Sequence, residues 1–120
     1  ALSHVAVAGN CDPFSALPRE LVFAAGGHQL FLTHGDRYQV KWDLFRLFLE
    51  GQDRKAAVII FGHTHQPLIH YEQGILLFNP GSLYRNNAGE APSCGWLTLG
   101  PDGIKPELKF ITEKAKGIVF

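Results

Sequence analysis

Histidines and small polar residues follow several of the apolar runs in this chain. The clearest group is Gly62-His63-Thr64-His65, which comes directly after the apolar run 56–61. In an extended strand, side chains two residues apart lie about 6.5–7 Å apart on the same side. Two imidazoles placed in this way can each reach one ion of a metal pair held about 3.5–4 Å apart. The alternative interpretation is that one histidine caps the strand and the other is solvated.

Two further groups follow apolar runs earlier in the chain. His34 comes after the run 29–33, and loops beyond strand ends are where α/β folds usually keep their sites, although a single histidine there is often structural. Asn10-Cys11-Asp12 comes after the run 5–8. Asn10 can offer a neutral oxygen to a metal, and Asp12 can orient a neighbouring ligand. The alternative is an Asx turn beside a small buried Cys11.

A fourth group, Asn79-Pro80-Gly81-Ser82, follows the apolar run 75–78. Its backbone N–H groups and the Ser82 hydroxyl can meet an anion, or the segment is an ordinary Pro-Gly turn. Taken together, the four groups offer imidazole and amide oxygen, which suit borderline ions such as Mn, Fe, Zn, Co or Ni. Carboxylates are scarce among these loops, where only Asp12 and Asp36 occur.

The elements that must position these residues can be predicted from apolar periodicity and turn residues. Apolar residues at i, i+4, i+7 and i+8 predict one amphipathic helix at about 40–50, with Trp42, Phe45 and Leu49 widening its apolar face. Glycine-containing turns predict three hairpins, which pair 21–25 with 29–33, 67–71 with 75–78 and 95–99 with 104–111. We therefore expect a mixed α/β fold, mostly of strands, with sheets packed face to face and helices outside.

Composition excludes several classes of protein. With 46% hydrophobic residues, the chain of 120 residues can fold as a single domain. Lysine plus arginine equals aspartate plus glutamate at 11 each, so we expect no bulk nucleic-acid-binding surface. No apolar run approaches the ~18 residues of a membrane span. Two cysteines are too few for a disulfide framework, which favours a reduced, cytoplasmic setting.

The motifs GNCD at 9–12, THG at 33–35, GHTH at 62–65 and NPGS at 79–82 resemble, in this order, the calcineurin-like metallophosphoesterases. More narrowly, they are similar to the small bacterial and archaeal phosphodiesterases in which Cys follows the motif Asn. The resemblance implies that residues 1–120 are one domain and form part of a four-layer α-β-β-α sandwich. The family's earlier Asp-x-His and Gly-Asp motifs do not occur at the start of this chain, so we expect the domain to be truncated at its N-terminus.

The resemblance also implies the roles of individual residues. Asn10, His34 and His63 would bind one divalent ion and His65 the other, and a hydroxide bridging the two ions would attack a phosphodiester. Manganese is the first candidate metal, with Fe, Zn, Co, Ni or Mg as alternatives. Cys11 occupies the place of a catalytic His in many relatives and would act with His34 and His63.

The remaining residues receive lesser roles from the resemblance. Arg37 and Ser82 would contact the substrate, while Asp12 and Asp36 would lie outside the ligands; His4 and His28 are expected to be structural and His70 solvated. The expected substrate is a small-molecule phosphodiester, without membrane binding. We also expect a homo-oligomer, or association with the missing N-terminal segment. We expect the intact protein to be an enzyme and this 120-residue chain on its own to be inactive. The alternative functions are a non-catalytic interaction scaffold of the retromer-subunit type, or an inactive fragment.

Overall fold

The computed structural model describes residues 17–84, 86–87 and 90–111. The predicted strand at 5–8, His4, and the candidate site residues Asn10, Cys11 and Asp12 lie outside these residues. Among the described residues, no helix is both long and apolar enough to cross a membrane.

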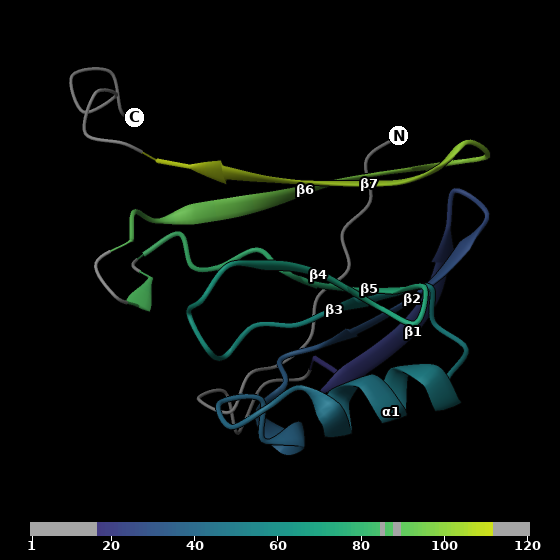
Figure 1. Cartoon of the computed structure of the whole chain (residues 1–120), viewed down its shortest axis with the longest axis horizontal. Helices are drawn as coiled ribbons and strands as arrows, with labels where there is room; N and C mark the ends of the chain where they lie inside the picture. Colours follow the sequence, from purple (N-terminus) through teal and green to yellow (C-terminus); the bar gives the residue numbers. More distant parts are fainter. Residues whose placement is uncertain (1–16, 85, 88–89, 112–120) are drawn as a thin grey trace.

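Two sheets and one α-helix make up the described part of the chain (Figure 1). The first sheet has five strands in the order β1-β2-β3-β5-β4, and the second is the hairpin β6-β7. The elements are β1 (Glu20–Ala25), β2 (His28–Thr33), the 3-10 helix η1 (Asp36–Tyr38), α1 (Phe45–Asp53), β3 (Val58–Ile60), β4 (Leu68–Glu72), β5 (Ile75–Asn79), β6 (Ser93–Gly100) and β7 (Gly103–Phe110). This architecture confirms the predicted mixed α/β class and all three predicted hairpins.

The five-stranded sheet is the middle layer of three. Figure 1 shows α1 on one face of this sheet and the β6-β7 hairpin on the other. Side chains alternate between the two faces along each central strand, and the central strands place apolar side chains on both faces. Phe31 and Ile59 face the cluster that includes Leu47 of α1, whereas Leu30 and Val58 face the cluster covered by the hairpin. The central strands are therefore buried on both faces, which explains their continuous apolar runs.

The helix begins later than its apolar periodicity predicts. We expected a helix at about 40–50, but α1 spans Phe45–Asp53. Residues 39–43 form a turn in which the carbonyl of Gln39 accepts hydrogen bonds from the N–H groups of Trp42 and Asp43. The side chain of Asp43 then accepts a hydrogen bond from the N–H of Phe45, the first residue of the helix. Competition from this local turn explains the later start.

The predicted apolar face of the helix divides between core and solvent. Leu47 and Phe48 are buried in the core, as is Val40 in the preceding turn. The side chains of Trp42, Phe45 and Leu49 are instead exposed, at 87%, 65% and 43%. The width of the apolar face therefore reflects surface residues rather than additional core.

Three parallel strands deliver the candidate site residues to one edge of the sheet. β2 pairs with β3 and β3 with β5, all in parallel register. The first of these strands is followed by His34, the second by the loop 61–65 and the third by the loop 80–82. Because parallel strands end at the same edge, these three segments meet there.

Candidate metal centre

His34 and His63 form the centre of the candidate site. Nδ1 of His63 lies 3.2 Å from Nε2 of His34, with the ring centroids 5.0 Å apart and the rings nearly perpendicular. Their backbones are joined as well, because the N–H of Gly62 donates to the carbonyl of His34 at 3.0 Å. Both rings are partly buried. The ends of β2 and β3 thus hold two imidazole nitrogens within contact distance.

The two rings are joined by a hydrogen bond, and the separation of its two nitrogens is also compatible with ligation of one metal ion. A tetrahedral ion with nitrogen ligands at 2.0–2.1 Å keeps two such nitrogens about 3.3 Å apart. The observed 3.2 Å is close to that value. Imidazole is a preferred ligand of Zn, Fe, Ni and related borderline ions. The donor set of this pair is therefore suited to the metal type that the sequence predicts.

The GHTH segment is not the extended strand that its spacing suggests. His63 and His65 both have left-handed backbone conformations, with φ of 70° and 53°. The N–H of Thr64 donates to the carbonyl of Gly62 at 2.8 Å, which closes a tight turn between the two histidines. Consequently the side chains of His63 and His65 do not follow the simple alternation of a strand. His65 is exposed, while His63 turns toward His34.

Three asparagines hold this turn and the neighbouring loop in place. Nδ2 of Asn79 donates to Oγ1 of Thr64 at 2.9 Å. Nδ2 of Asn87 donates to the carbonyl of Thr64 at 2.6 Å, and its N–H donates to the carbonyl of His65 at 2.8 Å. Buried Asn86 accepts a hydrogen bond from the N–H of Ser82 at 2.7 Å. The sequence patterns did not reveal Asn86 and Asn87, and the only available signal was their position in the polar segment after NPGS.

The surroundings of His63 shift its imidazole toward the neutral form. Burial lowers the pKa of the His63 imidazole, and the nearby positive charge of Lys41 and the ring of His34 lower it further. The carboxylate of Asp36 acts in the opposite direction, and His65 adds a smaller lowering effect. Metal ions bind the neutral imidazole, so this environment favours ligation over protonation.

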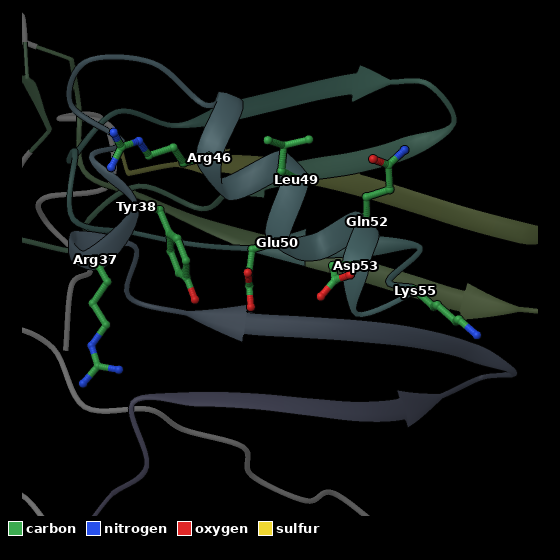
Figure 2. A pocket seen from close by; sticks show the side chains of 8 residues that line it. All are labelled: Arg37, Tyr38, Arg46, Leu49, Glu50, Gln52, Asp53 and Lys55. Atoms are coloured by element: carbon green, nitrogen blue, oxygen red, sulfur yellow. The ribbon is translucent and has the colours of Figure 1, made fainter.

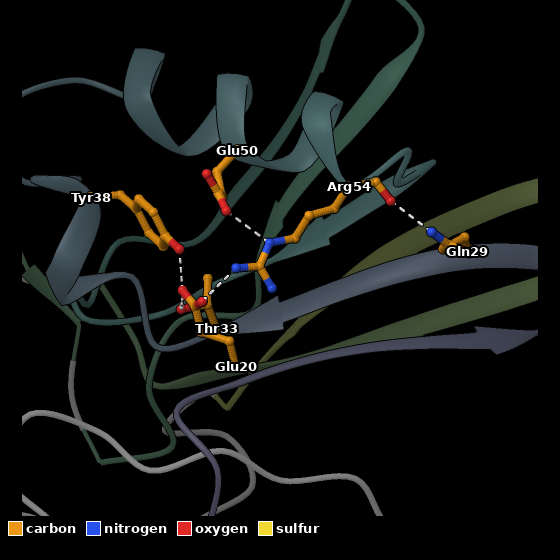
Figure 3. Close-up of polar contacts among 6 residues, drawn as sticks. All are labelled: Glu20, Gln29, Thr33, Tyr38, Glu50 and Arg54. Atoms are coloured by element: carbon orange, nitrogen blue, oxygen red, sulfur yellow. Dashed lines mark hydrogen bonds and ion pairs between the residues drawn. The ribbon is translucent and has the colours of Figure 1, made fainter.

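Asp36 and Arg37 lie in η1, just after the His34–Gly35 pair. The 3-10 helix is fixed by Tyr38, whose N–H donates to the carbonyl of Gly35 at 3.0 Å and whose hydroxyl donates to the carboxylate of Glu20 (Figure 3). Asp36 thus remains near His63, as its electrostatic effect shows. Arg37 is exposed and extends away from α1 at one end of the pocket drawn in Figure 2.

The pocket in Figure 2 is broad and shallow and contains none of the predicted metal ligands. It runs along α1 and is lined by Arg37, Tyr38, Arg46, Leu49, Glu50, Gln52, Asp53 and Lys55. Its volume is about 810 Å³. The expected contact of Arg37 with a substrate phosphate is not tested by this placement, and the imidazole pair lies elsewhere.

The NPGS loop offers fewer free donors than its sequence suggests. The N–H of Gly81 donates to Oδ1 of Asn79 at 2.9 Å, and that of Ser82 donates to Asn86. The hydroxyl of Ser82 accepts from the N–H of Tyr84 at 3.1 Å. These backbone N–H groups therefore shape the loop instead of pointing at an anion.

The other histidines of the described chain lie outside the site. Nε2 of His28 contacts the carbonyl of Gly100 at 2.8 Å, which ties β2 to the β6-β7 hairpin and agrees with the expected structural role. His70 is exposed and paired with Glu72 at 3.1 Å, as expected of a solvated residue. Within residues 17–84, 86–87 and 90–111, no group of three or more His, Cys, Asp or Glu residues gathers into a metal cluster. Among these residues the two imidazoles of His34 and His63 thus lie together without a third such side chain beside them.

A family model described as a calcineurin-like phosphoesterase superfamily domain matches residues 2–101. The chain belongs to this superfamily. It is 32% identical over 99 residues to the probable metallophosphoesterase YsnB of Bacillus subtilis, covering 82% of this chain and 59% of that protein. It is 30% identical over 108 residues to phosphodiesterase YfcE of Escherichia coli, covering 78% and 51%. The chain thus spans between half and three-fifths of the length of these two relatives.

A solved structure extends the comparison to the fold. Vps29 from Entamoeba histolytica, in complex with zinc, superposes with a TM-score of 0.70 over 87% of this chain and 67% of that one. The sequence identity is 22%, so this likeness concerns the fold alone. The superfamily membership confirms the resemblance carried by the four motifs.

Proposed function

We propose that this chain forms the imidazole-rich half of a two-metal phosphodiesterase site. The observation that carries the proposal is the pair of nitrogens, His34 Nε2 and His63 Nδ1, held 3.2 Å apart where two parallel strands end. Similarity to YsnB and YfcE supports a phosphoesterase activity. In this proposal the whole protein hydrolyses phosphodiesters, and its carboxylate ligands come from outside the residues that the structure describes.

Each candidate site residue has a defined role in this proposal. His34 and His63 present neutral nitrogens to one ion, together with the amide oxygen of Asn10, and His65 serves the other ion. Divalent ions, with manganese the first candidate and Fe, Zn, Co, Ni or Mg as alternatives, would supply positive charge to the transferring phosphoryl group and activate water. Asn79 and Asn87 hold the turn between His63 and His65, which sets the relative positions of the two imidazoles.

The reaction would replace one ester bond at phosphorus. The oxygen of a water molecule bonds to phosphorus, a P–O ester bond breaks, and the alcohol leaves with a proton. Cys11 stands where many relatives have a catalytic histidine, and a thiol is a poor substitute for imidazolium as a proton donor. We therefore propose that the protein prefers substrates with good leaving groups.

The proposal is tested by metal binding and hydrolysis on the same variants. Calorimetry with Mn²⁺ and Zn²⁺ should show that His34→Ala and His63→Ala each weaken binding by at least about tenfold. In the whole protein, release of p-nitrophenol from bis(p-nitrophenyl) phosphate should depend on added metal and be lost in His63→Ala. His70→Ala is the matched control, because His70 is an exposed histidine outside the pair. Equal metal affinity in His63→Ala and His70→Ala would contradict the proposal.

A second candidate function, an interaction scaffold, is favoured by one observation. Phe45 and Leu49 expose apolar side chains on α1, and the fold is shared with Vps29. A scaffold would bind a protein partner equally well with and without the imidazole pair. Loss of metal binding and of hydrolysis in His63→Ala would favour the enzyme over the scaffold.

A further inference from the structure

A groove runs beside the imidazole pair, between the 39–43 turn and the GHTH loop. One hollow of about 310 Å³ is lined by Val40, Lys41, Thr64, Gln66 and Asn87. A second hollow, of about 270 Å³, shares the first four of these residues and adds Trp42 and Asp43, among others. Thr64 lines both hollows, so the groove adjoins the GHTH loop that carries His63 and His65.

The 39–43 turn presents one aromatic ring and one positive charge to this groove. Val40 is buried in the core and anchors the turn, while the carbonyl of Gln39 accepts the N–H of Trp42 at 3.0 Å. The side chain of Trp42 is 87% exposed, the largest exposed fraction among the large hydrophobic residues of the described chain. An indole exposed to water can gain apolar contact area from a flat ligand.

Lys41 supplies a positive charge that takes part in no ion pair of the described residues. Those ion pairs involve Arg54 and His70, and none involves Lys41. The ammonium is close enough to His63 to act on that ring. The nearby carboxylate of Asp43 also lines the groove, but its Oδ1 accepts the N–H of Phe45 at 3.0 Å and is held at the start of α1.

The opposite wall of the groove is polar and is held in place by hydrogen bonds. Asn87 is fixed by its two hydrogen bonds to the GHTH loop. The backbone N–H of Gln66 donates to Oγ1 of Thr64 at 3.2 Å, and Gln66 lines both hollows. The hollow of about 270 Å³ is lined by the exposed Trp42, by Lys41 and by Gln66, whereas Asn87 lines only the adjoining hollow of about 310 Å³. The ring and the cation match two parts of a nucleotide, its flat base and its phosphate.

We propose that this groove binds a nucleotide, with its base stacked on the indole of Trp42 and its phosphate beside the Lys41 ammonium. The inference rests on the proposed phosphodiesterase function and deepens it, because it names nucleotide diesters as the substrate class. Stacking is tolerant of base identity, so the groove selects an aromatic base over an aliphatic alcohol without selecting one base.

The chain contains two tryptophans, which allows a direct binding measurement. In a Trp96→Phe background Trp42 is the only source of tryptophan fluorescence. Adenosine 5′-monophosphate should quench this fluorescence with saturation, in the presence of a chelator and without any turnover. Ribose 5-phosphate, which lacks the base, should not quench it. Equal responses to the two compounds, or no response to either, would overturn the proposal.

Matched variants separate the base from the phosphate, with affinity for adenosine 5′-monophosphate measured by calorimetry. Trp42→Leu should weaken binding by roughly fivefold to a hundredfold, the range expected of one stacked base. The control is Trp96→Leu, which makes the same change at a 60% exposed ring on β6 and should leave affinity unchanged. Lys41→Met should weaken binding of the nucleotide but not of adenosine, whereas Lys105→Met on β7 should do neither.

The two proposals fail in different ways. Nucleotide binding at Trp42 in a protein that hydrolyses no diester would contradict the phosphodiesterase function and leave the binding groove standing. Hydrolysis that is lost in His63→Ala, with equal affinities in Trp42→Leu and Trp96→Leu, would overturn the groove alone. A fluorescence change of Trp42 that depends on protein concentration and not on nucleotide would also overturn it, because the ring would then be a contact between copies of the chain.

Discussion

At the scale of single residues, the neutral state of His63 connects the site to protein stability. Burial and the charge of Lys41 lower the pKa of this imidazole below its ordinary value near 6.5. The unfolded chain therefore takes up the proton more readily than the folded chain. The stabilising contribution of His63 is present above about pH 6.5 and is lost as the pH falls through the lowered value.

This sign leads to a pH-dependence prediction for the metal-free chain. On going from pH 7 to pH 5, the free energy of unfolding should fall by more in the parent chain than in His63→Gln, because glutamine has no proton to take up. Urea unfolding at the two pH values measures the difference. His70→Gln serves as the control substitution at an exposed histidine. A pH response in His63→Gln as steep as that of the parent would contradict the assignment.

Gly81 in the NPGS loop is a second residue whose environment permits a specific prediction. It has φ of 78°, and a Cβ atom there would collide with Oγ of Ser93 and approach the amide of Asn86. Gly74 has nearly the same φ, 80°, but a Cβ atom added there would have nothing within 4 Å. Comparing alanine substitutions at Gly74 and Gly81 therefore separates the cost of left-handed backbone strain from the cost of a steric collision.

We expect Gly74→Ala to lower the free energy of unfolding by about 1–2 kcal/mol through left-handed strain. Gly81→Ala should cost that amount plus about 1–3 kcal/mol, because the Asn86–Ser93 contacts must shift. It should also weaken metal binding if the loop supports the turn of the GHTH motif through Asn79. Denaturant unfolding measures the free energy of unfolding of the two variants. Equal losses would contradict the predicted collision of a Cβ atom at position 81 with Ser93.

At the scale of elements, one polar cluster joins β1, η1 and α1 (Figure 3). The carboxylate of Glu20 accepts the hydroxyl of Tyr38 and pairs with Nη2 of Arg54 at 2.8 Å. Arg54 also pairs with Glu50 at 2.9 Å and lies 4.5 Å from the ring centroid of Phe31. Through Tyr38 this cluster fixes the 3-10 helix that follows His34.

Removing the charge at Glu20 should therefore affect both stability and the site. Glu20→Gln leaves Tyr38 and Arg54 with a weaker partner, and we expect a loss of about 1–3 kcal/mol in the free energy of unfolding. Burial and the bond to Glu20 raise the pKa of Tyr38, so the stabilising contribution of this tyrosine is lost as the pH rises above about 10. Glu72→Gln, in the exposed His70–Glu72 pair, is the control and should cost less than about 1 kcal/mol. If the two variants lost the same free energy of unfolding in urea, the cluster would stabilise the protein no more than the exposed His70–Glu72 pair does.

The elements also show what the sequence could and could not predict. The hairpins were predictable because Gly26-Gly27 and Gly103 supply the positive φ that tight turns require. The helix start was misplaced because apolar periodicity continues through the 39–43 turn, although Asp43 is a residue type that often precedes a helix. That His34 and His63 belong to one site was implied by the resemblance of their motifs to the family, whereas their positions after apolar runs alone left structural roles open. The supporting bonds of Asn86 and Asn87 depend on tertiary contacts that no local pattern records.

At the scale of the whole molecule, the two sheets come into close contact at Gly95 in β6. A Cβ atom at this position would lie 2.6 Å from the ring of Phe78 and 2.8 Å from Cβ of Pro80. Phe78 is buried near the end of β5, shortly before the Pro-Gly turn of the NPGS loop. The absence of a side chain at Gly95 thus sets the distance between the β6-β7 hairpin and the strand that leads to the site.

Gly95→Ala should accordingly push the hairpin away from the five-stranded sheet. We expect a loss of about 1–3 kcal/mol in the free energy of unfolding, the usual cost of inserting a methyl group into a packed interface. Gly100→Ala, in the same strand, is the matched control because nothing lies within 4 Å of its Cβ position. Amide hydrogen exchange should show faster opening of β6 and β7 in Gly95→Ala, while the strands β2 and β3 keep their protection. Since His28 binds the carbonyl of Gly100 at the far end of the hairpin, opening that also reached β2 would show that the two sheets unfold as one unit.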